Sequence, residues 1–310
     1  MSDTIAAVST GTQVCAIGIV RMSGGKAIEI ADRLFSPVSG RKMADCEDRK
    51  LIYGKLCDEQ GRLLDICLCT ISRAPNSYTG EDTAEFQCHG SPVVLRAVLE
   101  AAFSLGARQA LPGEFTKRAF LNGRMDLSGA EAVADIIDAE TAEAARNAAG
   151  QLGGAISRKI DAVYDTLTDI SSHYHAVLDY PDEDIEDFTL ARYESDIERC
   201  TAVLESLRAS YDSGKLLHSG VPAAIVGRPN AGKSSLLNAV LGYDRAIVTD
   251  IPGTTRDTIE EKLRLGGVLL RLTDTAGIRE TDDEIERMGV TRSRRAMEQA
   301  DLSLIHISEP

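Results

Sequence analysis

The segment Gly227-Arg-Pro-Asn-Ala-Gly-Lys-Ser234 has the residue types and the GxxxxGKS spacing of a phosphate-binding loop. Backbone N–H groups in such a loop surround the phosphates of a nucleotide, because its glycines allow close approach. Lys233 reaches the β- and γ-phosphates, and the Ser234 hydroxyl offers a ligand to Mg²⁺. A short apolar run precedes the loop and a helical pattern follows it, which is the context that the motif requires. The segment predicts a site for a nucleoside triphosphate with Mg²⁺.

Two later segments have residues that suit the same phosphates. Asp274-Thr-Ala-Gly277 follows an apolar run, so that Asp274 can hold Mg²⁺ through its water shell and Gly277 can sense the γ-phosphate. Thr249-Asp-Ile-Pro-Gly-Thr-Thr-Arg-Asp257 lies between this segment and the loop, and a threonine there can close on Mg²⁺ when the γ-phosphate is present. Each short motif is weak alone. Together they favour a GTPase-like switch.

The elements that must position these residues change character along the chain. Residues 1–120 are typical of an α+β domain, with strands expected at 16–20, 51–56, 65–71 and 84–88. A helix should begin near Ser91-Pro92, because serine is a good N-cap and proline suits the first helical position. Residues 121–215 have helical periodicity, in the stripes 156–170 and 193–211, which need partner helices. Residues 216–310 alternate between apolar runs (223–226 and 268–273) and helix, which predicts a parallel sheet with crossover helices.

Composition limits the remaining possibilities. The net charge of −14 argues against broad electrostatic binding to nucleic acid, although a small basic patch remains compatible with it. Seven cysteines without a CxxC pair indicate reduced thiols, and Cys67 and Cys69 are expected to be buried rather than to bind a metal. The charged run 179–187 is expected to be a solvated connection between helices. The sequence shows neither a signal peptide nor an apolar run long enough to span a membrane.

The phosphate-facing segments resemble those of the translation-factor-related GTPases, and within them the MnmE (TrmE) family of bacterial tRNA modification GTPases. The resemblance extends to Gly18–Gly24, Pro75–Asp82, Cys88–Gly90 and Pro112–Leu127, which are similar to the family's N-terminal domain. Leu178–Glu183 is similar to its helical domain. The resemblance as a whole covers nearly all of residues 1–301. The fold that this implies is multidomain: an α+β N-terminal folate-binding-like domain, an α-helical middle domain and an incomplete α/β P-loop GTPase domain.

The resemblance also implies an activity. It is GTP hydrolysis during modification of C5 of the wobble uridine, U34, of certain tRNAs, of the carboxymethylaminomethyl or aminomethyl type. The implied partners are a second copy of the chain, bound through the N-terminal domain, the FAD-dependent protein MnmG in a heterotetramer, and tRNA. The implied one-carbon donor is 5-formyl- or methylene-tetrahydrofolate. A cytoplasmic location is expected, with no membrane association.

Site residues follow from the same resemblance. Ile278 stands where Ras-like enzymes have a water-orienting glutamine, and it cannot do that work. The family implies instead a K⁺ ion in place of an arginine finger, with Asn230, Thr249, Ile251 and Thr254 as ligands, and Glu286 as the catalytic residue that orients water indirectly. Ser234 and Thr255 are the implied Mg²⁺ ligands, and Arg21, Glu81 and Arg124 the folate-contacting residues. The GTP-binding residues are Asn230, Ala231, Gly232, Lys233, Ser234, Ser235, Thr249, Asp250, Ile251, Pro252, Gly253, Thr254, Thr255, Asp274, Thr275, Ala276 and Gly277.

Two features depart from the family pattern. The guanine-reading NKxD motif and the terminal FCxGK motif are absent, and the tail 302–310 does not continue as the family does. Guanine specificity is therefore inferred, and we expect this chain alone to be a poor GTPase.

Three other interpretations remain open. The first is a ribosome-assembly switch of the Era or Der kind, which would lack the N-terminal 120 residues. The second is a one-carbon transferase regulated by its GTPase part. The third is a P-loop ATPase.

Overall fold

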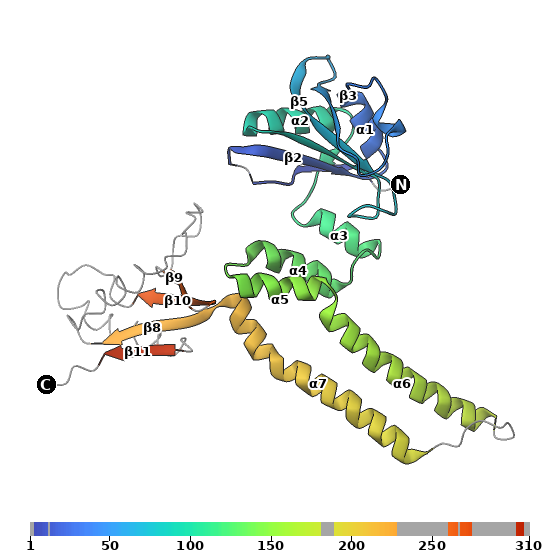
Figure 1. The fold of residues 1–310 in the computed structure, drawn as a ribbon, viewed down its shortest axis with the longest axis vertical. Helices are drawn as coiled ribbons and strands as arrows, with labels where there is room; N and C mark the ends of the chain where they lie inside the picture. Colours follow the sequence, from blue (N-terminus) through green and yellow to red (C-terminus); the bar gives the residue numbers. More distant parts are fainter. Residues whose placement is uncertain are drawn as a thin grey trace. The chain divides into compact units, whose positions relative to one another are not determined.

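The computed structural model describes residues 3–11, 13–180, 189–227, 260–265, 267–274 and 302–306. The chain divides into two compact units, Met1–Ala130 and Glu131–Pro310. Figure 1 colours both along the sequence. Each unit is described by itself.

The first unit is built on a seven-stranded sheet in the order β3-β4-β5-β6-β2-β1-β7. Neighbouring strands are antiparallel, except that β1 and β7 are parallel. The four strands predicted from the sequence are confirmed as β2, β4, β5 and β6. The bounds are β1 (Ile5–Val8), β2 (Cys15–Ser23), β3 (Phe35–Pro37), β4 (Ile52–Cys57), β5 (Leu63–Ser72), β6 (Thr83–Gly90) and β7 (Arg108–Gln109).

Three α-helices and a short 3₁₀ helix accompany this sheet. They are α1 (Ala27–Leu34), η1 (Met43–Asp45), α2 (Pro92–Ser104) and α3 (Glu114–Leu121). The predicted start of α2 is confirmed at Pro92 and Ser91 is its N-cap residue as expected, although the Ser91 side chain makes no capping hydrogen bond. The Ser91 carbonyl instead accepts from the Leu95 N–H at 3.0 Å.

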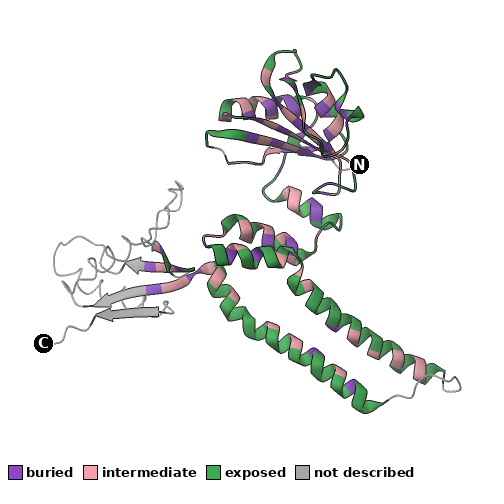
Figure 2. Ribbon diagram, viewed as in Figure 1, coloured by how far each residue is buried: buried purple, intermediate pink, exposed green. Residues whose placement is uncertain are grey.

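The hydrophobic core lies on one face of the sheet, beneath α1 and α2 (Figure 2). Alternation along β5 buries Cys67, Cys69 and Ile71, while Ile66, the residue before Cys67, is exposed. Burying each large core side chain contributes about 1.5–3 kcal/mol. The opposite face keeps exposed apolar side chains, including Ile17 and Tyr53.

Four helices form most of the second unit: α4 (Leu127–Asp138), α5 (Ala142–Leu152), α6 (Ala155–Asp179) and α7 (Leu190–Ser219). The two predicted apolar stripes are confirmed as helical, in α6 and α7. Their burial is only partial: Val163 and Cys200 are buried, whereas Ile160 and Leu204 are 42% and 43% exposed. The reason is that two long helices packed on each other cover only one line of side chains. No helix in the described part of the chain is long and apolar enough to cross a membrane.

A four-stranded sheet completes the described part of this unit, in the order β11-β8-β10-β9. Its strands are β8 (Val221–Gly227), β9 (Glu260–Leu265), β10 (Val268–Asp274) and β11 (Leu302–His306). Strand β8 is parallel to β10 and β11, as the alternating pattern predicts, and the antiparallel β9 was not expected. The predicted multidomain class, with α+β, helical and α/β parts, is confirmed.

Candidate functional site

The phosphate-binding motifs are described only at their first residues. Gly227 ends β8 and Asp274 ends β10, and the two strands are parallel neighbours with Asp274 paired to Ile225. Their carboxyl ends therefore meet at one edge, which is where open α/β sheets bind ligands. The other residues predicted for nucleotide, Mg²⁺, K⁺ or catalysis lie outside the described residues: Asn230, Ala231, Gly232, Lys233, Ser234, Ser235, Thr249, Asp250, Ile251, Pro252, Gly253, Thr254, Thr255, Thr275, Ala276, Gly277 and Glu286.

The loop 77–82, which precedes β6, carries the first described candidate, Glu81. Its Oε2 accepts hydrogen bonds from Ser23 Oγ at 2.7 Å and from Arg118 Nη1 at 2.9 Å. Ser23, at the end of β2, also bonds Thr79 Oγ1 at 2.7 Å. These contacts hold the Glu81 carboxylate in one orientation.

Arg118, on α3, is the centre of this polar cluster, and sequence reasoning assigned it no role. Besides Glu81, its guanidinium donates to the Asp3 carbonyl at 2.8 Å, to Asp3 Oδ1 at 2.7 Å and to Glu114 Oε1 at 3.1 Å. Its side chain is only 10% exposed. Burial opposes the charge, but the hydrogen bonds to Glu81 and Glu114 outweigh it and raise the pKa of Arg118. The one feature of the sequence that could have pointed to Arg118 is its position in Pro112–Leu127, a segment that resembles the family's N-terminal domain.

Arg21, the second candidate, lies on β2 two residues before Ser23, and therefore on the same face of the sheet. Its Nε donates to Glu85 Oε1 at 2.6 Å. Its guanidinium carbon lies 5.4 Å from the centre of the Tyr78 ring and 5.7 Å from that of the Phe115 ring. Two aromatic faces and one carboxylate thus fix a half-buried cation beside the loop 77–82.

Arg124, the third candidate, follows α3 and is exposed. Its backbone N–H donates to the Ala119 carbonyl at 2.8 Å. Its Cγ lies 3.3 Å from where a Cβ on Gly80 would stand, so its stem borders the loop 77–82 at a glycine whose φ is +76°. The structure therefore brings Arg21, Glu81 and Arg124 around one loop, with two cations flanking one carboxylate.

A second set of ion pairs, centred on Glu114, holds the first residue of α3. The Glu114 carboxylate accepts from Arg108 Nη2 at 2.6 Å, from Arg108 Nη1 at 2.9 Å and from the Leu111 N–H at 2.8 Å. The hydrogen bonds from Arg108, aided by Leu111 and Arg118, lower the pKa of Glu114 to about 2. Glu114 therefore stays ionised and continues to pair with Arg118 well into acid.

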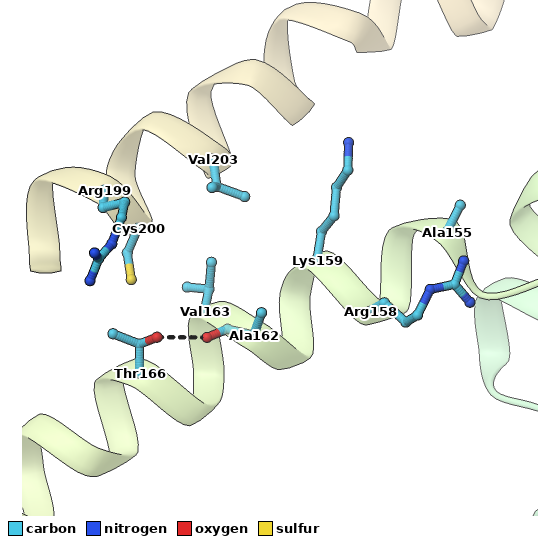
Figure 3. Close-up of a pocket in the computed structure, with 9 residues that line it drawn as sticks. All are labelled: Ala155, Arg158, Lys159, Ala162, Val163, Thr166, Arg199, Cys200 and Val203. Atoms are coloured by element: carbon cyan, nitrogen blue, oxygen red, sulfur yellow. Dashed lines mark hydrogen bonds between the residues drawn. The ribbon is translucent and has the colours of Figure 1, made fainter.

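A separate groove of about 540 Å³ lies between α6 and α7, and no residue predicted for a ligand site lines it. Figure 3 shows Val163 and Cys200 turned toward each other from the two helices, with Arg158, Lys159 and Arg199 nearby. The Arg199 guanidinium pairs with Asp196 on its own helix. The groove is therefore apolar at its floor and basic at its rim.

The fold and these motifs define a multidomain protein of the P-loop class, and comparison with known proteins identifies its family. A sequence profile described as "GTP-binding protein TrmE N-terminus" matches residues 4–124, and another, "MnmE helical domain", matches residues 127–307. The chain belongs to the MnmE (TrmE) family of tRNA modification GTPases.

Proteins named tRNA modification GTPase MnmE are similar along the chain. The one from Clostridioides difficile (strain 630) is 46% identical over 302 residues, which is 97% of this chain and 66% of the relative. Those from Roseiflexus sp. (strain RS-1) and Geobacillus thermodenitrificans (strain NG80-2) are each 48% identical, over 98% of this chain and 64% and 66% of their own lengths. This chain thus spans just under two thirds of the relatives that it matches.

The lowered pKa of Glu114 predicts an acid-dependent contribution to stability. Because the pKa falls from 4.5 in the unfolded chain to about 2 in the folded one, the contribution is complete above pH 4.5. It is lost as the pH falls from about 4.5 toward 2. Glu114→Gln should therefore lower the melting temperature of the first unit at pH 7, and the gap from the unmodified chain should narrow at pH 3. Differential scanning calorimetry of both proteins at pH 7 and at pH 3 measures this difference in melting temperature.

The matched control is Glu100→Gln, since Glu100 is an exposed residue of α2. It should change the melting temperature little at either pH. If Glu114→Gln lowered the melting temperature as much at pH 3 as at pH 7, the result would contradict the assignment of an ion pair to Glu114.

Proposed function

We propose that this chain belongs to a GTP-hydrolysing enzyme that modifies C5 of U34 in tRNA. The observation that carries the proposal is the 46–48% identity to tRNA modification GTPases along 97–98% of the chain. The meeting of Gly227 and Asp274 at one carboxyl edge of a parallel sheet supports it, because both belong to phosphate-facing motifs. The modification is of the carboxymethylaminomethyl or aminomethyl type.

The nucleotide site is proposed at this edge. Lys233 would neutralise the β- and γ-phosphates, and the hydroxyls of Ser234 and Thr255 would ligate Mg²⁺. Oxygens of Asn230, Thr249, Ile251 and Thr254 would hold K⁺, which would supply the positive charge that other GTPases take from an arginine finger. Glu286 positions the attacking water indirectly, since Ile278 offers it no hydrogen bond.

The folate site is proposed around the loop 77–82. Arg21 and Arg124 provide cations for the carboxylates of a reduced folate, and Glu81 accepts from pterin N–H donors. The fixed orientation of Glu81 and the stacked Arg21 favour this assignment, because both groups are held before a ligand arrives. In the described residues Arg21 has one ion-pair partner, Glu85, which engages Nε and leaves the two Nη atoms for a carboxylate. The donor is 5-formyl- or methylene-tetrahydrofolate.

The proposed assembly joins two copies through their N-terminal domains and adds the FAD-dependent MnmG to give a heterotetramer that acts on cytoplasmic tRNA. The face of the first unit's sheet opposite α1 and α2 supports the dimer, because it exposes apolar side chains. Among them are Ile17 at 59%, Tyr53 at 58% and Ile66 at 39%. The division into residues 1–120, 121–215 and 216–310 is likewise proposed as the functional domain plan.

Binding of 5-formyl-tetrahydrofolate to the full chain tests the folate site. Calorimetric titration should give a 1:1 complex, and Glu81→Gln should weaken it at least about tenfold, because a lost charged acceptor costs about 1.4 kcal/mol or more. Glu100→Gln should bind as the unmodified chain does, and melting temperatures should show both variants folded. Unchanged affinity in folded Glu81→Gln would remove Glu81 from the site.

The K⁺ site is tested by GTP hydrolysis in a protein extended to the length of the relatives. Replacing Na⁺ by K⁺ at constant ionic strength should raise kcat by about 10- to 100-fold, which reaches only the lower end of the effect of one transition-state hydrogen-bond donor. Asn230→Ala should remove the preference for K⁺ while retaining nucleotide binding. Equal rates in Na⁺ and K⁺ would overturn the K⁺ assignment.

A further inference from the structure

Two cysteines face each other inside the first unit, away from the loop 77–82. The β5–β6 register pairs Leu68 with Gln87 and Cys69 with Phe86. Continued by one residue, it sets Cys67 directly opposite Cys88. Side chains directly opposite each other on antiparallel strands lie on the same face, about 4.5–5.5 Å apart at Cβ. Cys67 is 5% exposed and Cys88 1% exposed, so both thiols lie within the core.

A carboxylate joins this pair. Asp65 precedes Cys67 by two residues on β5, and one of its oxygens and the two Sγ atoms all lie within 4.8 Å of one another. The Asp65 side chain is 10% exposed. It is held by His89, whose backbone N–H donates at 2.8 Å and whose Nδ1 lies 2.8 Å from Oδ1. Carboxylates that ligate metals are themselves held by hydrogen bonds, and His89 supplies such contacts to Asp65.

The surrounding sheet gives the thiols apolar walls. Gly54 pairs with Cys67 on one side, and Gly18 pairs with Cys88 on the other. A Cβ on Gly18 would stand 2.6 Å from the Leu95 side chain, and one on Gly54 would stand 2.6 Å from that of Phe35. The glycines thus let Leu95 and Phe35 pack close to the strands on both sides of the thiols.

The chemistry of two sulfurs and one carboxylate oxygen selects a thiophilic divalent cation. Soft thiolates favour Zn²⁺ or Cd²⁺ over Mg²⁺ and Ca²⁺, which take oxygen ligands. Zn–S bonds of about 2.3 Å place two sulfurs about 3.8 Å apart in a tetrahedral site. Atoms already within 4.8 Å reach that spacing by side-chain adjustments of about 1 Å.

We propose that Asp65, Cys67 and Cys88 form a binding site for Zn²⁺ in the N-terminal unit, with water as the fourth ligand. Binding converts the two thiols to thiolates and releases their two protons to solvent, so no oxidation is involved. The cation then replaces the contact between two neutral thiols with bonds that link β5 to β6. The site shares no residue with those proposed for folate or for GTP.

The full chain tests the proposal, prepared in metal-free buffer with a reductant that does not bind metals. Cd²⁺ is the spectroscopic probe, because thiolate ligation gives an ultraviolet charge-transfer band, and competition then reports Zn²⁺ affinity. We expect one Cd²⁺ per chain. Cys67→Ser and Cys88→Ser should each weaken binding at least about 100-fold and abolish most of the band, whereas Cys46→Ser, at another buried thiol of the same core, should leave both unchanged.

Asp65→Asn keeps the side-chain volume and tests the site without removing a core thiol. Asp65→Asn should weaken Cd²⁺ binding at least about tenfold. If either serine variant fails to fold, the affinity of Asp65→Asn for Cd²⁺ provides the test. In the unmodified full chain, Zn²⁺ should also raise the melting temperature of the first unit. In the Asp65→Asn chain it should leave that temperature unchanged. Absence of the band at equimolar Cd²⁺, or equal affinity in folded Asp65→Asn, would overturn the proposal.

Discussion

The buried guanidinium of Arg118 is the constraint on which the N-terminal unit depends at its polar end. A cation that is 10% exposed must be matched by acceptors, and its acceptors come from its own helix, at Glu114, and from two distant segments: Asp3 before β1 and Glu81 in the loop 77–82. Breaking a buried pair by removing one partner costs about 3–5 kcal/mol, because the other charge stays buried. The Arg118–Glu81 pair therefore ties α3 and the loop 77–82 to the sheet.

The candidate folate site follows from this anchoring. Glu81 is held by Arg118 and Ser23, and Arg21 is held separately by Glu85 and by the rings of Tyr78 and Phe115. Two oppositely charged groups thus lie near one loop, and each is held by partners of its own. An anionic, hydrogen-bonding ligand suits such an arrangement, because the protein charges are oriented before it binds. The nucleotide motifs start from a different sheet, at the ends of β8 and β10.

The sequence predicted the long elements well and the contacts between them poorly. Alternation located β2, β4, β5 and β6, and helical periodicity located α6 and α7, because each pattern spans many residues. Short strands such as β3 and β7 carry too few residues to show a period, and β9 gave no signal of its antiparallel direction. Arg118 looked like any helical arginine, since two of its three partners, Glu81 and Asp3, are 37 and 115 residues away. Likewise, the sequence relates Cys67 to Cys69, which follows it two residues later, whereas the cysteine opposite Cys67 in the sheet is Cys88. Arg21, Glu81 and Arg124 came from the family resemblance, and their placement around one loop needed the fold.

The central claim is that Arg118 fixes the loop 77–82 by way of Glu81. Amide hydrogen exchange in Arg118→Met, which keeps much of the apolar stem but removes the charge, tests it most directly. The account predicts exchange at least about tenfold faster for the amides of residues 79–82, with little change in the centres of β5 and β6, because only the anchored loop opens locally. Protection of residues 79–82 that matches the unmodified chain would contradict the account.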